Sequence, residues 1–452
     1  MESGSSQATI APAKFGSAQI GQTKTGQAKT GQAKTGQAKI GTPPLLLRAA
    51  DWLSDAAGFL RRPLLADELI ETAQRRTGLN DFGEWQFLPA LRVLLQSCED
   101  EAALGAFGRF ALRWDVLRFI ENLLRLRATE KASDTPAPAV ERPIFVTGLP
   151  RSGTTFLHSL LMADKANVVP RCWQTIDPAI VGDAAAETRA MRQVDRQLKL
   201  FRWIAPDFGA MHPITATAPQ ECCEITAHVF ASLRFDTTHR VPTYRAWLDA
   251  AGHLEAYRFH RYFLAHLARH APARQRWVLK CPDHVFALDA IQQVYPDARF
   301  VFVHRDPTRV LASVAHLTEV LRQPFTRHLD RATIGRQVCD RWAEGAERII
   351  AASEHLPADR VVHIRYRELI GDPAGTVSRL YAKFGLPFNA AFERQIRAYV
   401  DEKPHGGYGG LRHRLEDYGI DPAQERDRFA DYIETFDVTP ERRQLVAEEA
   451  AA

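Results

Sequence analysis

The spacing of apolar residues along the chain changes near residue 140. Before that point, apolar side chains recur three and four positions apart, which is the period of an amphipathic helix. Two such series are Leu91, Leu94, Leu95 and Cys98, and then Phe107, Phe110, Ala111 and Trp114. We therefore expect residues 42–135 to form an N-terminal helical cap region, closed by the proline-containing linker 133–138.

Short apolar runs without polar alternation follow the linker. They cover residues 143–147, 277–279, 299–303 and 361–364. Segments with a helical pattern lie between or after them, at 154–162, 286–294, 308–321 and 374–384. Continuous apolar strands interleaved with helices are typical of a parallel sheet that is covered on both faces.

The sequence therefore predicts an α/β fold of the P-loop type for residues 136–452, with an open parallel sheet and helices on both faces. Ligands of such folds bind at the carboxyl ends of the strands. Residues 166–276 read as largely helical, and we expect them to supply the contacts to a substrate.

The first 41 residues have a different composition. A five-residue unit repeats from position 21 (GQTKT, GQAKT, GQAKT, GQAKI), and almost nothing in it can pack. We expect a disordered tail, because a glycine in every fifth position opposes a helix. The tail contains five lysines and one acidic residue, so it carries the whole net charge of +4. It is either a solvated tail or a weak electrostatic tether to an acidic partner.

The remaining composition narrows the classes of protein. Basic and acidic residues balance outside the tail, which argues against a nucleic-acid-binding protein. None of the six cysteines forms a CxxC pair, so neither a zinc ribbon nor a thioredoxin-type site is indicated, and sparse cysteines fit a reducing compartment. No apolar run approaches the ~20 residues that span a bilayer. We expect a cytoplasmic protein without a membrane span or signal peptide.

The first apolar run leads into a loop that predicts anion binding. Its sequence is Gly148-Leu149-Pro150-Arg151-Ser152-Gly153-Thr154-Thr155. Glycines permit a tight turn in which N–H groups and the start of a helix surround a phosphate. An ordinary strand-to-helix turn is the alternative. A nucleotide triphosphatase needs lysine directly after the second glycine, and Thr154 stands there, so ATP hydrolysis is disfavoured.

A second anion-binding signal follows the run 299–303. The segment is His304-Arg305-Asp306-Pro307, and Ser313 comes eight residues after Arg305. Pro307 suits the first turn of a helix, and Arg305 at the end of a strand can reach a second phosphate. A surface Arg–Asp pair would explain this segment alone, but two such signals at strand ends favour a ligand with two anionic groups.

Taken in order, four segments resemble the motifs of a known family. The segments are GLPRSGTTFLHSLL, VLKCPDH, VFVHRDPTRVLASV and HIRYRELIGDP. They are similar to those of the sulfotransferases that use 3′-phosphoadenosine 5′-phosphosulfate (PAPS), and the resemblance covers about residues 140–440. It is strongest to the bacterial branch, which has arginine in the first loop where cytosolic eukaryotic members have lysine.

The resemblance implies that the chain transfers a sulfuryl group from PAPS to a hydroxyl or amine acceptor, without a metal. It places the 5′-phosphosulfate on Arg151, Ser152, Gly153, Thr154 and Thr155. It places the 3′-phosphate on Arg305 and Ser313, and the adenine near Phe156 and Tyr366. The glycine-rich stretch 405–410 is loosely similar to the C-terminal loop that covers the cofactor in this family.

Charge stabilisation should dominate catalysis, since sulfuryl transfer resembles phosphoryl transfer. Arg151 is the candidate for neutralising the leaving phosphate. Lys280 matches a family lysine near the transferred group. A hydroxyl acceptor also needs a general base, and we consider His284 and Glu221 the first candidates.

Other candidates for the base are weaker. Gln174 falls at the position where some relatives have a glutamate, and an amide cannot take up a proton. Asp177 is close enough in sequence to substitute. His158 and His212 are ambiguous, because a histidine inside a helix is more often a structural residue.

Two other functions remain open from the sequence. The chain could be a P-loop phosphotransferase such as a kinase, or a non-catalytic nucleotide-binding protein of the same fold. The acceptor cannot be read either, so small molecules, carbohydrates, lipids and peptides all remain possible partners.

Overall fold

The computed structural model describes residues 62–134, 136–204, 214–269, 276–402 and 414–441. All of them belong to one compact unit, Ala38–Ala452. The repeat-containing tail, His212 and the glycine-rich stretch 405–410 lie outside the described residues.

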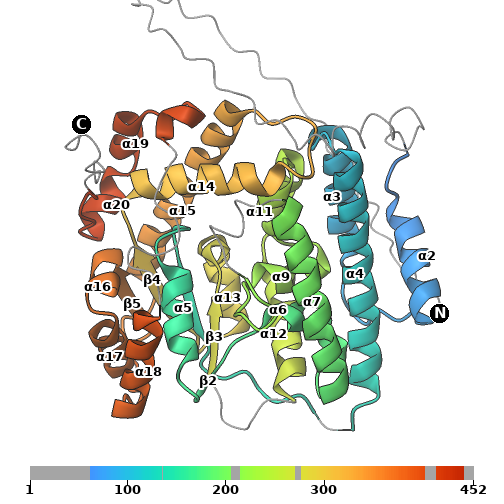
Figure 1. Ribbon diagram of the computed structural model, residues 1–452, viewed down its shortest axis with the longest axis horizontal. Helices are drawn as coiled ribbons and strands as arrows, with labels where there is room; N and C mark the ends of the chain where they lie inside the picture. Colours follow the sequence, from blue (N-terminus) through green and yellow to red (C-terminus); the bar gives the residue numbers. More distant parts are fainter. Residues whose placement is uncertain (1–61, 135, 205–213, 270–275, 403–413, 442–452) are drawn as a thin grey trace, which may run out of the picture. The chain divides into compact units, whose positions relative to one another are not determined.

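A five-stranded sheet forms the centre of the described structure (Figure 1). Its strands are β1 (Ile144–Gly148), β2 (Asn167–Val168), β3 (Arg276–Lys280), β4 (Arg299–His304) and β5 (Val361–Arg365). Their order is β2-β3-β1-β4-β5, and every neighbouring pair is parallel. The predicted parallel α/β sheet is therefore confirmed. The two-residue β2 is an addition, too short to leave a pattern in the sequence.

Helices cover both faces of this sheet, as predicted. Those before β1 are α2 (Ala66–Thr77), α3 (Leu88–Glu101) and α4 (Ala106–Lys131). Those between β1 and β3 are α5 (Thr154–Met162), α6 (Cys172–Ile176), η2 (Pro178–Ile180), α7 (Ala184–Ile204), α9 (Cys223–Thr226), η3 (Ala227–Val229), α10 (Arg234–Thr238), α11 (Pro242–Ala251) and α12 (Leu254–Ala268). After β3 come η4 (Pro282–Phe286), α13 (Leu288–Val294), α14 (Pro307–Arg322), α15 (Arg331–His355), α16 (Tyr366–Gly371), α17 (Pro373–Lys383), α18 (Ala390–Asp401), η5 (Leu415–Tyr418), α19 (Pro422–Arg428) and α20 (Ala430–Thr435).

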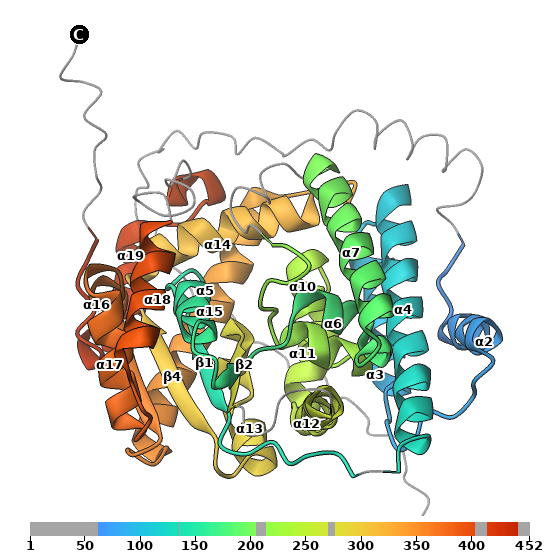
Figure 2. The same ribbon diagram turned by 60° about the horizontal axis from the view of Figure 1, so that its bottom comes forward.

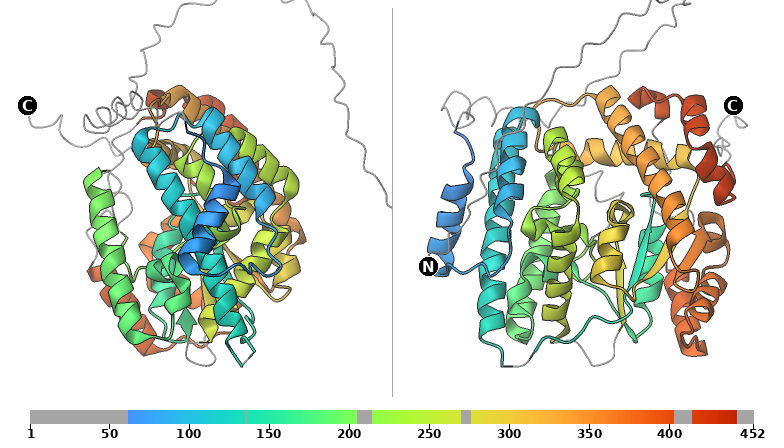
Figure 3. Two further views of the ribbon diagram at one scale, coloured as in Figure 1. Left: turned by 90° about the vertical axis from the view of Figure 1, so that its right-hand side faces the viewer. Right: turned by 180° about the vertical axis from the view of Figure 1, so that it is seen from behind.

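The two faces of the sheet belong to two apolar clusters, because successive side chains of a strand point in opposite directions. Ile144 and Val146 of β1 pack with α5 and α16–α18. Phe145 lies between them and packs into the larger cluster, which contains residues of α12, α13 and α15. Viewed from behind, α13 and α15 lie in front of the strands (Figure 3, right).

The N-terminal helices are part of that larger cluster. Helices α9–α12 lie between α3–α4 and the sheet (Figures 1 and 2), and buried residues of all these helices form one core. No described helix is long and apolar enough to cross a membrane.

Helix α4 differs from the face that its sequence implied. An amphipathic helix on the predicted pattern would bury Phe110 and Trp114, but they are 62% and 43% exposed. The buried face instead runs through Leu112 and Val116, and it includes Arg109. Arg109 can be buried because its guanidinium donates to the carboxylate of Glu99 at 2.8 Å. The series on α3 is buried as its pattern implied.

Candidate active site

Three residues with left-handed backbone conformations, two of them glycines, shape the turn between β1 and α5. Gly148, Arg151 and Gly153 have positive φ angles of 135°, 62° and 98°. A Cβ on Gly148 would lie 2.3 Å from the carbonyl oxygen of Val303 on β4, so only glycine allows the two strands this approach. A loop in which residues with positive and negative φ alternate presents its backbone N–H groups to one side. The N-terminus of α5 adds further N–H groups there.

Ser152 supplies a further sign of an anion site in this loop. The residue is fully buried, and its hydroxyl has no hydrogen-bond partner within the described part of the chain. A buried hydroxyl without a partner is costly, so a donor left over in an anion-binding loop fits a phosphate or sulfate oxygen. These loop residues therefore suit the phosphosulfate end of PAPS.

The two predicted anion-binding segments meet at the ends of β1 and β4. Arg305 Nη1 donates to the carbonyl oxygen of Arg151 at 2.8 Å, and Arg151 Nε donates to Ser313 Oγ at 3.2 Å. Burial, and then the neighbouring charge of Arg305, lower the pKa of Arg151. The site thus holds two neighbouring guanidinium groups, of which Arg305 is paired with the carboxylate of Glu441.

Aromatic side chains flank this positive site. The guanidinium carbon of Arg305 lies 3.9 Å from the ring centroid of Tyr366, the first residue of α16. The same ring packs against Gly153, where an added Cβ would lie 3.0 Å from it. The ring centroid of Phe156 lies 6.3 Å from that of Tyr399 on α18. Tyr366 thus contacts both anion-binding segments, whereas Phe156 is partly buried against the core.

Lys280 brings the end of β3 to the same place. Its side chain is only 2% exposed, and its ammonium donates to Thr155 Oγ1 at 3.1 Å. It also forms an ion pair with Glu221 Oε1. Glu221 precedes α9, and its side chain is 26% exposed. The structure therefore joins the predicted lysine, the predicted carboxylate and the phosphate loop.

His284, the other predicted base, lies deeper. It is completely buried in η4, and its Nδ1 forms a 2.5 Å hydrogen bond with the hydroxyl of Tyr257. Burial, followed by the nearby His260 and Lys280, lowers the pKa of His284 well below its usual range. The side chain is thus a neutral part of the core next to the site.

The weaker candidates have local structural roles. His158 is fully buried on α5 and its Nε2 donates to the carbonyl oxygen of Val278 at 3.0 Å. Burial is the main reason that its pKa falls to about 3. Gln174 caps α6 by accepting a hydrogen bond from the backbone N–H of Arg171. Asp177 follows α6, and burial raises the pKa of its carboxyl group.

One residue of the site left no signal in the sequence. Glu441 comes after the last described helix, and its carboxylate forms a two-bond contact with the guanidinium of Arg305 at 2.8 and 2.9 Å. Its backbone N–H donates to Asp306 Oδ2 at 2.8 Å. Glu441 is 136 positions from Arg305, and no pattern links the two segments.

Comparisons with known proteins agree with this arrangement. A model described as "Sulfotransferase family" matches residues 143–390. Omega-hydroxy-beta-dihydromenaquinone-9 sulfotransferase Stf3 of Mycobacterium bovis is 26% identical over 290 residues, which cover 59% of this chain and 68% of the relative.

Two solved structures extend the likeness over most of the chain. Sulfotransferase STF1 from Mycobacterium tuberculosis has a TM-score of 0.72 at 30% identity, covering 81% of this chain and 98% of that one. Sulfotransferase STF9 from Mycobacterium avium has a TM-score of 0.73 at 26% identity, covering 84% and 98%. With the family model matching more than half of its residues, this chain belongs to the sulfotransferase family.

Proposed function

We propose that this sulfotransferase takes its sulfuryl group from PAPS and transfers it to a hydroxyl or amine acceptor, with the site residues in the roles below. The observation that carries the proposal is the meeting of Arg151, Arg305 and Ser313 at the ends of β1 and β4. PAPS has two anionic ends, and two basic segments beside each other match them.

The phosphate loop binds and neutralises the 5′ end of the donor. Arg151, Ser152, Gly153, Thr154 and Thr155 would hold the phosphosulfate through backbone N–H groups, hydroxyls and one guanidinium. As the S–O bond to the leaving phosphate breaks, negative charge grows on that phosphate. Arg151 stabilises this charge from a fixed position, which requires little reorganisation during the reaction.

The 3′ end is assigned to Arg305 and Ser313. Arg305 is held against the ring of Tyr366 and the backbone of Arg151, so the orientation of its guanidinium group is fixed before a ligand binds. Tyr366 and Phe156 are proposed to contact the adenine. The 3′-phosphate distinguishes PAPS from other adenine nucleotides, and a preset guanidinium is the side chain best suited to select it.

Glu221 is the better candidate for the general base. It is partly exposed and paired with Lys280, whereas His284 is completely buried and bonded to Tyr257. The ionised carboxylate of Glu221 would take the proton of the acceptor hydroxyl. When it does so, the charge of Lys280 is no longer compensated and acts on the loop beside Thr155, where negative charge develops.

We further propose a hydroxyl-bearing apolar molecule as the acceptor. The name of Stf3 describes a lipid-like hydroxylated menaquinone as the substrate of that relative. In this chain, Leu200 and Trp203 near the end of α7 are 58% and 70% exposed, which gives an apolar surface for such a molecule. We place the reaction in the cytoplasm, since all six cysteines are free thiols.

The test begins with binding of adenosine 3′,5′-bisphosphate, followed by turnover with PAPS. Calorimetric titration should give tight binding without metal, and weaker binding of ADP with Mg²⁺. Arg305→Ala should weaken binding of the bisphosphate strongly and leave adenosine 5′-phosphate almost unchanged. Equal losses for both ligands would refute the assignment of Arg305.

Turnover separates an enzyme from a non-catalytic binder of the same fold. Apolar alcohols, phenols, sugars and tyrosine peptides should each be offered with labelled PAPS. Transfer to an apolar alcohol supports the proposed acceptor class, and transfer only to sugars or peptides contradicts it. Binding of the bisphosphate without any transfer would favour the non-catalytic alternative.

A further inference from the structure

Two thiols lie directly behind the Lys280–Glu221 pair. Cys223 is the first residue of α9, and Cys281 follows the last residue of β3. Both donate to the same oxygen, Glu221 Oε2, at sulfur–oxygen distances of 3.8 and 3.9 Å. The three donor atoms all lie within 4.8 Å of one another.

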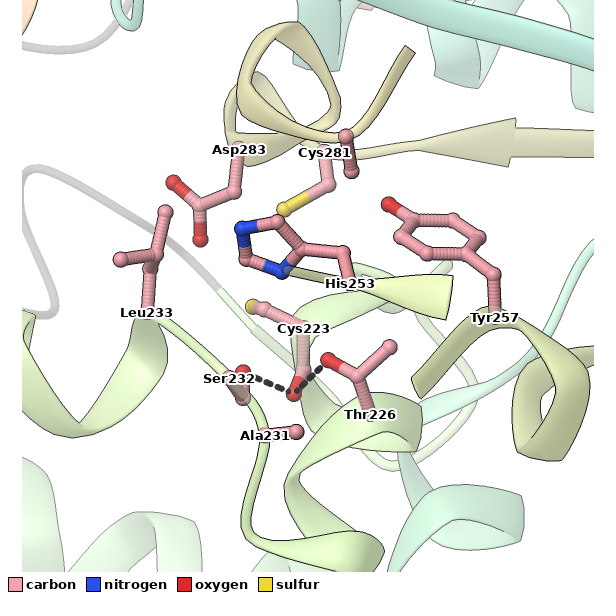
Figure 4. Close-up of a pocket in the computed structure, with 10 residues that line it drawn as sticks. Cys223, Thr226, Ala231, Ser232, Leu233, His253, Tyr257, Cys281 and Asp283 are labelled. Atoms are coloured by element: carbon pink, nitrogen blue, oxygen red, sulfur yellow. Dashed lines mark hydrogen bonds between the residues drawn. The ribbon is translucent and has the colours of Figure 1, made fainter. Parts of the chain in front are cut away.

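The thiols also face a small pocket. It has a volume of about 20 Å³, which is room for a water or an ion. Figure 4 shows Cys223 and Cys281 among its lining side chains, together with the ring of His253 and the carboxylate of Asp283. Asp283 belongs to η4, which begins directly after Cys281. Sulfur, nitrogen and oxygen donors therefore converge on one space next to the proposed base.

We propose that Cys223, Cys281 and Glu221 form a binding site for a thiophilic divalent cation of the Zn²⁺ class, and that occupation of this site inhibits sulfuryl transfer. The site is distinct from the donor site, which needs no metal in the function proposed above.

The geometry is close to what such a cation requires. Tetrahedral Zn²⁺ bonds sulfur at about 2.3 Å and carboxylate oxygen at about 2.0 Å, which sets the S···O separation at about 3.5 Å. The observed separations are 3.8 and 3.9 Å. A contraction of a few tenths of an ångström would bring both S···O separations to this value. Asp283, His253 or a water in the pocket can supply the fourth ligand.

The proton and charge balance also fits. Zn²⁺ binds thiolates, so each thiol releases one proton as its Zn–S bond forms, and the metal brings two positive charges. The local charge of two thiols, Glu221 and Lys280 is therefore the same before and after binding. The Lys280 ammonium on Oε1 and the metal on Oε2 can thus share one carboxylate.

The expected inhibition rests on the proposed role of Glu221. A carboxylate with a metal on one oxygen and Lys280 on the other is a much weaker base. The charge of Lys280 would also stay compensated throughout the reaction. Transfer should therefore slow down when the metal binds, while binding of the nucleotide at the loop should not change.

Co²⁺ is a suitable probe, since thiolate ligands give it a charge-transfer band in the near ultraviolet. The full-length protein, in a phosphine reductant, should show this band together with the visible spectrum of tetrahedral Co²⁺. Cys223→Ser and Cys281→Ser should each weaken Co²⁺ binding at least about tenfold. Loss of a residue that only hydrogen-bonds a metal ligand already lowers metal affinity by about this factor, and here a ligand itself is lost. The control Cys339→Ser removes a buried thiol on α15 and should keep the wild-type titration.

Binding of adenosine 3′,5′-bisphosphate reports whether each variant is folded. A Co²⁺ spectrum without thiolate bands, or one that persists in both Cys223→Ser and Cys281→Ser, overturns the metal site. For inhibition, the ratio of turnover with and without Zn²⁺ is compared between the wild type and Cys281→Ser. Equal ratios overturn the inhibitory role. Failure of the function itself would be visible separately, as no turnover in the absence of metal.

Discussion

The contact between Glu441 and Arg305 leads to a prediction about the nucleotide affinity of the enzyme. The carboxylate of Glu441 accepts hydrogen bonds from Nε and Nη2 of Arg305, the residue that we assign to the 3′-phosphate. The contact is also anchored through the backbone, by Asp306 on the N–H of Glu441 and by Arg309 on its carbonyl oxygen at 3.4 Å. A donor nucleotide must therefore displace an anion that belongs to the chain itself.

The cost of this displacement can be bounded from the structure. A hydrogen bond to a charged group contributes about 1.5–3 kcal/mol when it is shielded from water. The two side chains are 18% and 20% exposed, which reduces this contribution through solvent screening. We therefore expect a cost of about 1–2 kcal/mol, which corresponds to a factor of about 5–30 in the dissociation constant.

The assay is calorimetric titration of Glu441→Gln with two ligands. Adenosine 3′,5′-bisphosphate should bind about 5–30 times more tightly than to the wild type. Adenosine 5′-phosphate, which lacks the 3′-phosphate, should bind equally well to both proteins. Glu434→Gln is the matched control, because it removes the same charge from an exposed position on the nearby α20.

Either of two results would refute the reasoning. An equal gain for both ligands, reproduced in Glu434→Gln, would mean that only the general negative charge of this segment matters. Weaker binding of the bisphosphate to Glu441→Gln would mean that Glu441 positions Arg305 for the ligand and does not compete with it.

Four further outcomes are expected. Glu221→Gln should lower kcat about 10²–10⁴-fold with little change in bisphosphate affinity; a kcat within a factor of two of the wild type would exclude Glu221 as the base. Lys280→Met should lower kcat about 10²–10³-fold, and an equal loss in nucleotide binding would instead make it a binding residue. Gly148→Ala should cost about 3 kcal/mol or more of stability in urea unfolding, since its Cβ would strike Val303; an unchanged midpoint would contradict the close approach of β1 and β4. Burial lowers the pKa of His158 and His260 to about 3, so the unfolded chain binds these protons first as the pH falls below about 6.5. Stability should then drop by up to about 1.4 kcal/mol per pH unit for each histidine, and a constant free energy of unfolding between pH 7.5 and 5 would disprove this.

The features that depend on neighbouring residues in the sequence were predictable. The apolar runs identified four of the five strands, and the glycines with Arg151 identified the loop between β1 and α5. The start of α14 was predictable for the same reason, because Asp306 caps the helix and Pro307 occupies its first turn.

Features that depend on distant residues were not predictable. Glu221 and Lys280 are 59 positions apart, and their pairing depends on how α9 packs beside the end of β3. The contact of Glu441 depends in the same way on the path of the last helices. The buried face of α4 could not be read either, because burial of Arg109 depends on Glu99 from another helix.

The close approach of Gly148 to Val303 fixes how far apart the carboxyl ends of β1 and β4 lie. These two residues are partners in the register of β1 and β4, and the two anion-binding segments begin immediately beyond them. On the proposed assignment, adjacent backbones thus set where the two phosphate-binding segments start relative to each other. On that assignment, changes in the helices between β2 and β3 would leave this backbone spacing unchanged.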